Sequence, residues 1–160
     1  MQRVVSSVVA LAWGLWCGGI VMVFVTVMSL FKTFPEQPKV AGAAAAGVFR
    51  RFEVMELVLA PVALVAALLW RDKRRSLPRV WVVMVLSVAA AGAATSRFMI
   101  TPKIDDMRRR GVPSSSEEFR SAHRAATSVY VAQAAVLLAA GILMPAAIVG
   151  PRRKDEPSPS

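Results

Sequence analysis

The sequence has little of the chemistry on which most soluble enzymes depend: one cysteine, one histidine and one tyrosine, with ten acidic residues against twenty basic ones. The lone Cys17 excludes an internal disulfide. No zinc-ligand spacing, glycine-rich phosphate loop or catalytic triad pattern is present, and neither is a helix-turn-helix or an RNP-like aromatic motif. These absences favour a protein that is not an enzyme and that does not bind nucleic acid.

Apolar residues, in contrast, are abundant. They make up 56 % of the 160 residues, and the mean hydropathy is +0.52. Four apolar runs have the ~20 residues that a helix needs to cross a ~30 Å hydrocarbon core. The second run reaches this length only when its flanking residues are included. We therefore expect an all-α membrane protein, a four-transmembrane-helix bundle over residues 1–150 with a disordered tail at 151–160. The expected spans are 4–31, 54–70, 80–100 and 125–149.

Local signals add detail to this bundle. Gly14 and Gly18, one turn apart in the first span, predict a face that another helix can approach closely. Pro38 predicts the start of a helix that leads into the second span, because proline is tolerated in a first turn. Ser115 and Glu118 have the spacing of a capping box, which predicts that the last helix starts there.

The net charge of +10 comes mainly from basic residues at the ends of the apolar runs. Lys and Arg in such places flank membrane spans and contact anionic headgroups, so the lipid bilayer is the expected partner. The densest short basic segment is residues 71–79, between the second and third spans. By the positive-inside rule, this segment predicts a multi-pass protein of the cell (inner) membrane with both termini in the cytoplasm.

Charged residues also occur within the apolar runs. Glu56 lies near the start of the second span and Arg97 near the end of the third, so antiparallel spans bring them to the same side of the membrane. Both lie on helical faces with small residues, which mark packed faces in membranes. We therefore predict an ion pair between Glu56 and Arg97, with Glu53 and Arg51 nearer the headgroups. The two predicted faces are Glu53, Glu56, Ala60, Ala63 and Ala67, and Ser87, Ala90, Ala94 and Arg97.

The fourth span carries a polar stripe of His123, Thr127, Tyr130 and Gln133 that descends into the membrane. Together with the charged residues, this stripe predicts a polar cluster that forms a pocket open to one membrane face. Such a cluster is either a clamp between helices or a binding site for a small ligand, an ion or a partner helix. The candidate residues are Arg51, Glu53, Glu56, Arg97, His123, Tyr130 and Gln133.

Metal binding is a weaker prediction. His123, Cys17 and Met99 are residue types that Cu(I) accepts, but none of them stands at ligand-motif spacing from another. The residues alone therefore predict no firm metal ligand and no cofactor.

Several short motifs follow one another along the chain in a characteristic order. WGLWCGG in the first span is followed by SLFKTFP, FRRFE opens the second span, ITPKIDDMRRRG closes the third, and EEFRSAHRAATSVYVAQ opens the fourth. In these motifs the chain resembles the transmembrane protein 205-like family, a four-helix membrane domain of unknown function related to copper resistance protein D-like membrane proteins. The resemblance runs from Trp13 to Leu143 and implies the same four-helix fold. The characteristic positions of that family fall on Phe31, Pro35, Phe49, Phe52, Pro102, His123 and Gln133.

We expect, on these grounds, a non-enzymatic accessory membrane protein whose polar cluster binds a small ligand, an ion or a partner helix. The first alternative is a protein that handles copper or haem, which the resemblance implies and which needs His123 with a second ligand such as Met99 or Cys17. The second alternative is a small transporter. It would have to be a homo-oligomer, because a single four-helix unit lacks an inverted repeat.

Overall fold

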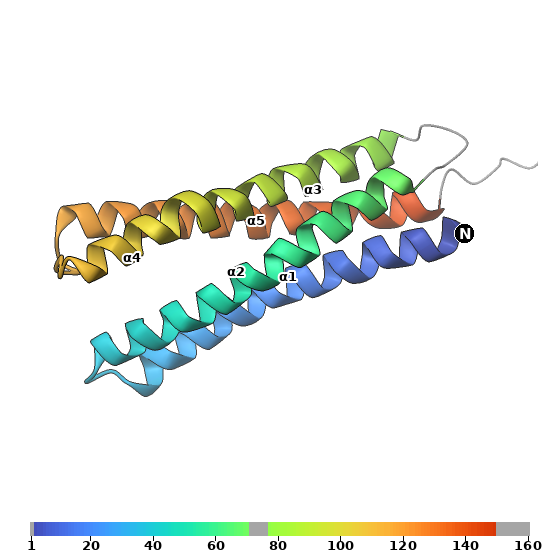
Figure 1. Cartoon of the computed structure of the whole chain (residues 1–160). Coiled ribbons are helices and arrows are strands. Elements are labelled where there is room, and N and C mark those ends of the chain that lie inside the picture. The colour runs from blue at the N-terminus through green and yellow to red at the C-terminus, as the bar shows by residue number, and fades with distance from the viewer. Residues whose placement is uncertain (1, 71–76, 150–160) are drawn as a thin grey trace, which may run out of the picture.

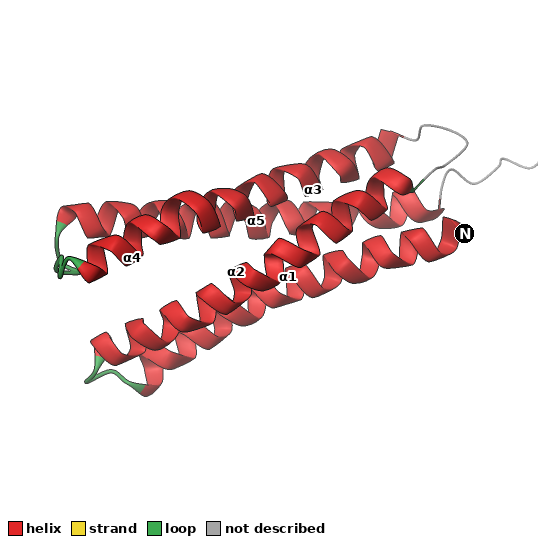
Figure 2. Cartoon of the chain, in the orientation of Figure 1, coloured by secondary structure: helices red, strands yellow, loops and turns green. Residues whose placement is uncertain are grey.

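The computed structural model describes residues 2–70 and 77–149, and every regular element within these ranges is a helix (Figure 2). The predicted all-helical architecture is confirmed. The predicted tail at 151–160 and most of the basic segment at 71–79 lie outside the described residues. The elements are α1 (Gln2–Thr33), α2 (Pro38–Leu69), α3 (Leu77–Thr95), the π-helical turn η1 (Ser96–Ile100), α4 (Thr101–Arg109) and α5 (Glu117–Val149).

These elements form two antiparallel pairs, which together make a forked bundle. α1 pairs with α2, and the unbroken helix α3–η1–α4 pairs with α5 (Figure 1). The pairs contact each other chiefly through α2 with α3 and through α1 with α5. They lie together at the end that holds Gln2 and Val149, and they diverge toward the α1–α2 and α4–α5 connections (Figure 1).

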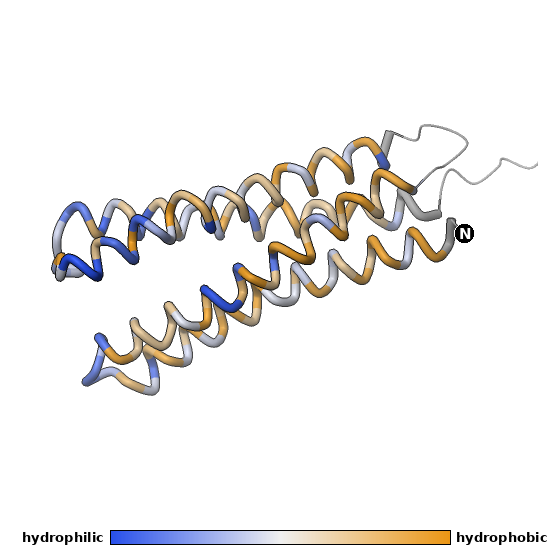
Figure 3. Tube along the Cα trace, in the orientation of Figure 1, coloured by the Kyte–Doolittle hydropathy of each residue, from blue (hydrophilic) through white to orange (hydrophobic). Residues whose placement is uncertain are grey.

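Four helical segments are long and apolar enough to cross a membrane. Figure 3 shows hydrophobic residues along most of their length, with hydrophilic residues gathered at the α4–α5 connection. Large apolar side chains such as Ile142, which is 79 % exposed, stay on the outer surface, where a lipid environment accepts them. The helix predicted to lead into the second span is confirmed, and it is continuous with that span as α2. The four segments are Val4–Thr33, Pro38–Leu69, Arg79–Arg109 and Glu117–Pro145.

The packed face of α2 is the predicted one, but that of α3 differs by one residue. Ser87 and Ala94 are exposed. Val82 and Leu86, both fully buried, lie on the observed face and make more packing contacts than serine or alanine could. Since successive helical residues are rotated by about 100°, this shift turns Ser96 instead of Arg97 into the bundle. The buried residues of α3 and η1 are Val82, Leu86, Ala89, Ala93 and Ser96.

Close helix packing occurs at glycines other than the predicted pair. A Cβ atom added at Gly14 or Gly18 would meet nothing within 4 Å in the described part of the chain. At Gly19, in contrast, a Cβ atom would lie 2.6 Å from Met55 Cε, and at Gly141 it would overlap the indole ring of Trp13. The prediction for Gly14 and Gly18 is therefore wrong within this chain, because large side chains approach α1 and α5 at neighbouring glycines instead.

The N-cap of α5 is Ser116, one residue after the predicted Ser115. The Phe119 amide N–H donates a hydrogen bond to Ser116 Oγ at 3.2 Å. Glu117 and Glu118 then occupy the first turn, where negative charge interacts favourably with the helix dipole.

The packing of Trp13 on Gly141 predicts that Gly141→Ala destabilises the protein. Trp13 Nε1 donates to the Leu137 carbonyl at 2.7 Å, so moving the ring away from a new Cβ atom would disturb this bond. We expect a loss of about 1–3 kcal/mol in the free energy of unfolding, measured by thermal or denaturant unfolding in detergent. Gly47→Ala is the matched control, because nothing lies within 4 Å of a Cβ atom there. Equal effects of the two substitutions would contradict the packing.

Candidate functional site

Two glutamates lie inside the bundle. Glu53 and Glu56 are each 1 % exposed and stand one turn apart on the packed face of α2. Glu53 is 15 residues from Pro38 and 16 from Leu69 (53 − 38 and 69 − 53), so it lies midway along the helix. We call these glutamates and the side chains around them the polar centre, which comprises Trp16, Glu53, Glu56, Ser96, Thr101, Tyr130 and Gln133.

Glu56 joins three helices. Its Oε1 atom accepts a hydrogen bond of 2.7 Å from Trp16 Nε1 of α1 and a second from Gln133 Nε2 of α5. Trp16 is fully buried and Gln133 is 2 % exposed. An indole N–H and an amide group in an apolar bundle need such partners, because no water is at hand to replace them.

Glu53 extends the polar centre toward α4. Its Oε1 atom accepts a hydrogen bond of 2.9 Å from the Tyr130 hydroxyl of α5 and another from Thr101 Oγ1 of α4. The ring of Tyr130 also packs against Phe49 of α2, with 4.9 Å between ring centroids. Through the two glutamates, therefore, α2 is hydrogen-bonded to all three of the other long helices.

The π-helical turn η1 places side chains at the polar centre. The Thr101 amide N–H donates to the Ser96 carbonyl, a bond between residues five positions apart. In a regular α-helix two such residues differ in direction by about 140°. A wider turn brings them closer to the same face, so Ser96 is buried while Thr101 reaches Glu53. π-helical turns of this kind occur frequently at functional sites.

Five buried side-chain atoms have no hydrogen-bond partner among the described residues, and four of them are oxygens of the polar centre. Most buried polar groups in native proteins are hydrogen-bonded, so a concentration of unpartnered oxygens at one place needs an explanation. Gly92 of α3 lies beside this place, since a Cβ atom there would come within 4.0 Å of Gln133 Oε1. The five atoms are Glu53 Oε2, Glu56 Oε2, Ser96 Oγ, Gln133 Oε1 and Arg97 Nε.

The predicted ion pair between Glu56 and Arg97 is wrong. Within residues 2–70 and 77–149, neither Glu53 nor Glu56 has a basic nitrogen within 4.0 Å. The one-residue shift of the α3 face explains this, because Arg97 is only partly buried and Glu56 Oε1 is occupied by neutral donors.

Acidic residues near the α4–α5 connection, in contrast, do pair with arginines. The nearest N–O distances are 3.6 Å for Asp105 with Arg50 and 2.9 Å for Asp106 with Arg110. Exposed ion pairs of this kind contribute little to stability, about 0–1 kcal/mol each. They show, however, that arginines do pair with acidic residues outside the polar centre.

The other predicted residues lie outside the polar centre. Arg51 is exposed on α2, and its neighbour Arg50 is the residue that reaches α4. His123 is exposed as well, although it shares a helical face with Tyr130, because at this level of α5 its neighbour Ala122, which is 6 % exposed, takes the buried position. The predicted stripe thus contributes only Tyr130 and Gln133. The expected pocket open to one membrane face is instead a closed centre at mid-length of the helices.

The metal candidates are not gathered into a site. Met99 is 69 % exposed and His123 is exposed, whereas Cys17 is buried in the apolar core. The described residues contain no group of three or more His, Cys, Asp or Glu that could hold a metal ion.

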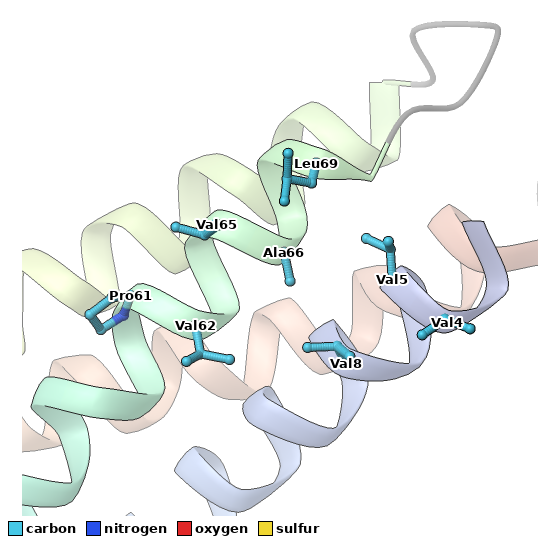
Figure 4. A pocket seen from close by; sticks show the side chains of 8 residues that line it. All are labelled: Val4, Val5, Val8, Pro61, Val62, Val65, Ala66 and Leu69. Atoms are coloured by element: carbon cyan, nitrogen blue, oxygen red, sulfur yellow. The ribbon is translucent and has the colours of Figure 1, made fainter. Parts of the chain in front are cut away.

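An apolar groove lies away from the polar centre. It has a volume of about 460 Å³ and lies between the start of α1 and the end of α2 (Figure 4). Its walls offer no charged or hydrogen-bonding side chain, so it has no group to orient a polar ligand. The lining residues are Val4, Val5, Val8, Pro61, Val62, Val65, Ala66 and Leu69.

Trp16, Ser96 and Thr101 belong to the polar centre but are absent from the sequence-based prediction. Trp16 carried a usable signal, because an indole N–H in the middle of an apolar span must find an acceptor. Ser96 and Thr101 depend on the π-helical turn, for which the sequence offers no comparable sign.

Residues 11–113 match the family model described as a domain of unknown function (DUF4149), and the chain belongs to that family. No curated protein and no solved structure shows a significant match to the chain. The matched region contains Trp16, Glu53, Glu56, Ser96 and Thr101, whereas Tyr130 and Gln133 follow it in α5. With its four long apolar helices, the protein is a multi-pass membrane protein of this family.

The bond between Trp16 and Glu56 predicts that Trp16→Phe destabilises the protein although it keeps an aromatic ring. The substitution removes the indole donor and leaves the buried carboxyl group with one partner fewer. We expect a loss of about 1.5–3 kcal/mol in the free energy of unfolding, measured in detergent. Trp81→Phe, at a site that is 51 % exposed, is the control and should cost much less. If both variants unfold like the wild type, the hydrogen bond is not stabilising.

Proposed function

We propose that this member of the DUF4149 family is a non-enzymatic membrane protein that binds a small polar ligand or ion at the polar centre. The observation that supports the proposal is the group of four buried oxygens without partners, on Glu53, Glu56, Ser96 and Gln133.

A helix clamp is the alternative explanation of the same residues. A network that only joins helices stabilises them best when all of its polar groups are paired, since each buried unpaired group costs about 1–3 kcal/mol. Here Glu53 and Glu56 use one oxygen each and leave the other open. Clamping accounts for the occupied Oε1 atoms, and ligand binding accounts for the free Oε2 atoms.

A copper- or haem-handling role, suggested by the resemblance to copper resistance protein D-like membrane proteins, receives less support. It needs His123 with Met99 or Cys17, but His123 and Met99 are exposed on the outer surface while Cys17 lies in the core. A transporter role would require two or more copies to form a pathway. No feature of the described residues favours it over simple binding.

Native mass spectrometry of the protein in mild detergent tests ligand binding. We expect the wild type to carry a non-protein mass that the double variant Glu53→Gln/Glu56→Gln lacks, because the variant keeps the shape of the side chains but removes their negative charge. Glu36→Gln is the matched control, since Glu36 is exposed in the α1–α2 connection. Circular dichroism should show that all three proteins are folded. Identical bound masses in the wild type and the double variant would contradict the proposal.

A further inference from the structure

We propose that the ligand of the polar centre is a monovalent alkali cation, with Na⁺ as the representative ion; this inference rests on the proposed function. The proposal rests on the chemistry of the four unpartnered oxygen atoms. Glu53 Oε2, Glu56 Oε2, Gln133 Oε1 and Ser96 Oγ are all oxygens, the ligand type that hard cations prefer.

The charge at the polar centre points to the same kind of ligand. Two carboxyl groups lie one turn apart on α2, each 1 % exposed. A buried negative charge without a cation is costly, and in the described part of the chain no basic nitrogen lies within 4.0 Å of either glutamate. The four donors that do reach them, from Trp16, Thr101, Tyr130 and Gln133, are uncharged. A bound cation supplies the missing positive charge.

The buried setting favours a monovalent ion, because a divalent ion gives up its bound water less readily. Calcium takes about 6–8 oxygen ligands, and magnesium needs an octahedral shell that usually includes several waters. The polar centre offers four free side-chain oxygens in a buried setting, which leaves such a shell incomplete. Gln133 and Ser96 add two oxygens from outside the acidic pair, and both residues are about as buried as the glutamates, at 2 % and 1 % exposure.

The four oxygens also come from three different elements. The glutamates belong to α2, Ser96 to η1 and Gln133 to α5, so an ion held among them would connect both helix pairs of the fork. Binding should therefore stabilise the whole bundle against unfolding, because the unfolded chain lacks the site.

Thermal unfolding of the full chain in detergent, at constant ionic strength and pH, tests this inference. We compare NaCl, KCl and N-methylglucamine chloride, and expect an alkali cation to raise the unfolding midpoint by about 5 °C in a saturable manner. Equal midpoints in all three salts would overturn the proposal. A larger rise with Mg²⁺ or Ca²⁺ would overturn it in favour of a divalent ion, and a rise seen only on acidification would overturn it in favour of bound protons.

Ser96→Ala locates the site. Ser96 Oγ is one of the four free oxygens, and the midpoint of each variant without alkali cations serves as its own reference. We expect the half-saturating Na⁺ concentration to rise about tenfold. Ser87→Ala, at an exposed site on the same helix, is the control and should bind Na⁺ like the wild type. An alkali effect that Ser96→Ala does not weaken would place the ion elsewhere and overturn the inference.

The mass spectrometry and the unfolding measurements together separate this inference from the proposed function. If mass spectrometry finds a bound organic species while alkali cations have no effect, only the inference fails. If both measurements are negative, the proposed function fails too.

Discussion

The arrangement of the four long helices depends on two carboxyl groups buried at the middle of an apolar bundle. Packing of apolar side chains alone orients membrane helices weakly, since lipid contacts are about as favourable as helix contacts. Hydrogen bonds to Glu53 and Glu56 are directional, and they come from Trp16, Thr101, Tyr130 and Gln133 on the three other helices. A slide of any helix by one turn would separate a donor from its acceptor. The glutamates therefore fix the register of both helix pairs.

The fork of the bundle and the π-helical turn act on this same place. α3 packs closely on α5, and Leu86 and Leu137 are fully buried in the apolar core, but beyond η1 the helix pairs diverge (Figure 1). η1 lies at the level where contact between the pairs changes from apolar packing to hydrogen bonding. The helix is continuous through this wider turn. Before the turn it presents apolar residues to the core, and after the turn it presents Thr101 to Glu53. The polar centre thus lies where apolar packing between the helix pairs ends, and its hydrogen bonds join the pairs at that level.

Hydropathy predicts the four helices, and three-and-four spacing predicts the packed face of α2, because both follow from local sequence. The observed face of α3 does not follow from the same rule. The predicted face consists mostly of small residues, but the larger Val82 and Leu86 are the ones buried between the helices. Their burial rotates the helix so that Ser96 is buried instead of Arg97. Arg97 was expected to balance Glu56 because opposite charges on neighbouring spans suggest a pair. Neutral donors satisfy the carboxyl group instead, and nothing in the sequence ranks an indole on α1 above a guanidinium in η1.

The two groups of acidic residues differ in their hydrogen-bond and ion-pair partners. Near the α4–α5 connection, Asp105 and Asp106 have arginine partners within 4.0 Å, in a chain with twice as many basic as acidic residues. Basic side chains are therefore numerous, and one of them, Arg97, directly follows Ser96 within η1. The polar centre nevertheless holds its carboxyl groups with neutral donors and leaves an oxygen of each one free. A network completed by arginine would join the helices but would be closed to other charges. A network of neutral donors also joins the helices, and it leaves Glu53 Oε2 and Glu56 Oε2 open for the cation that we propose.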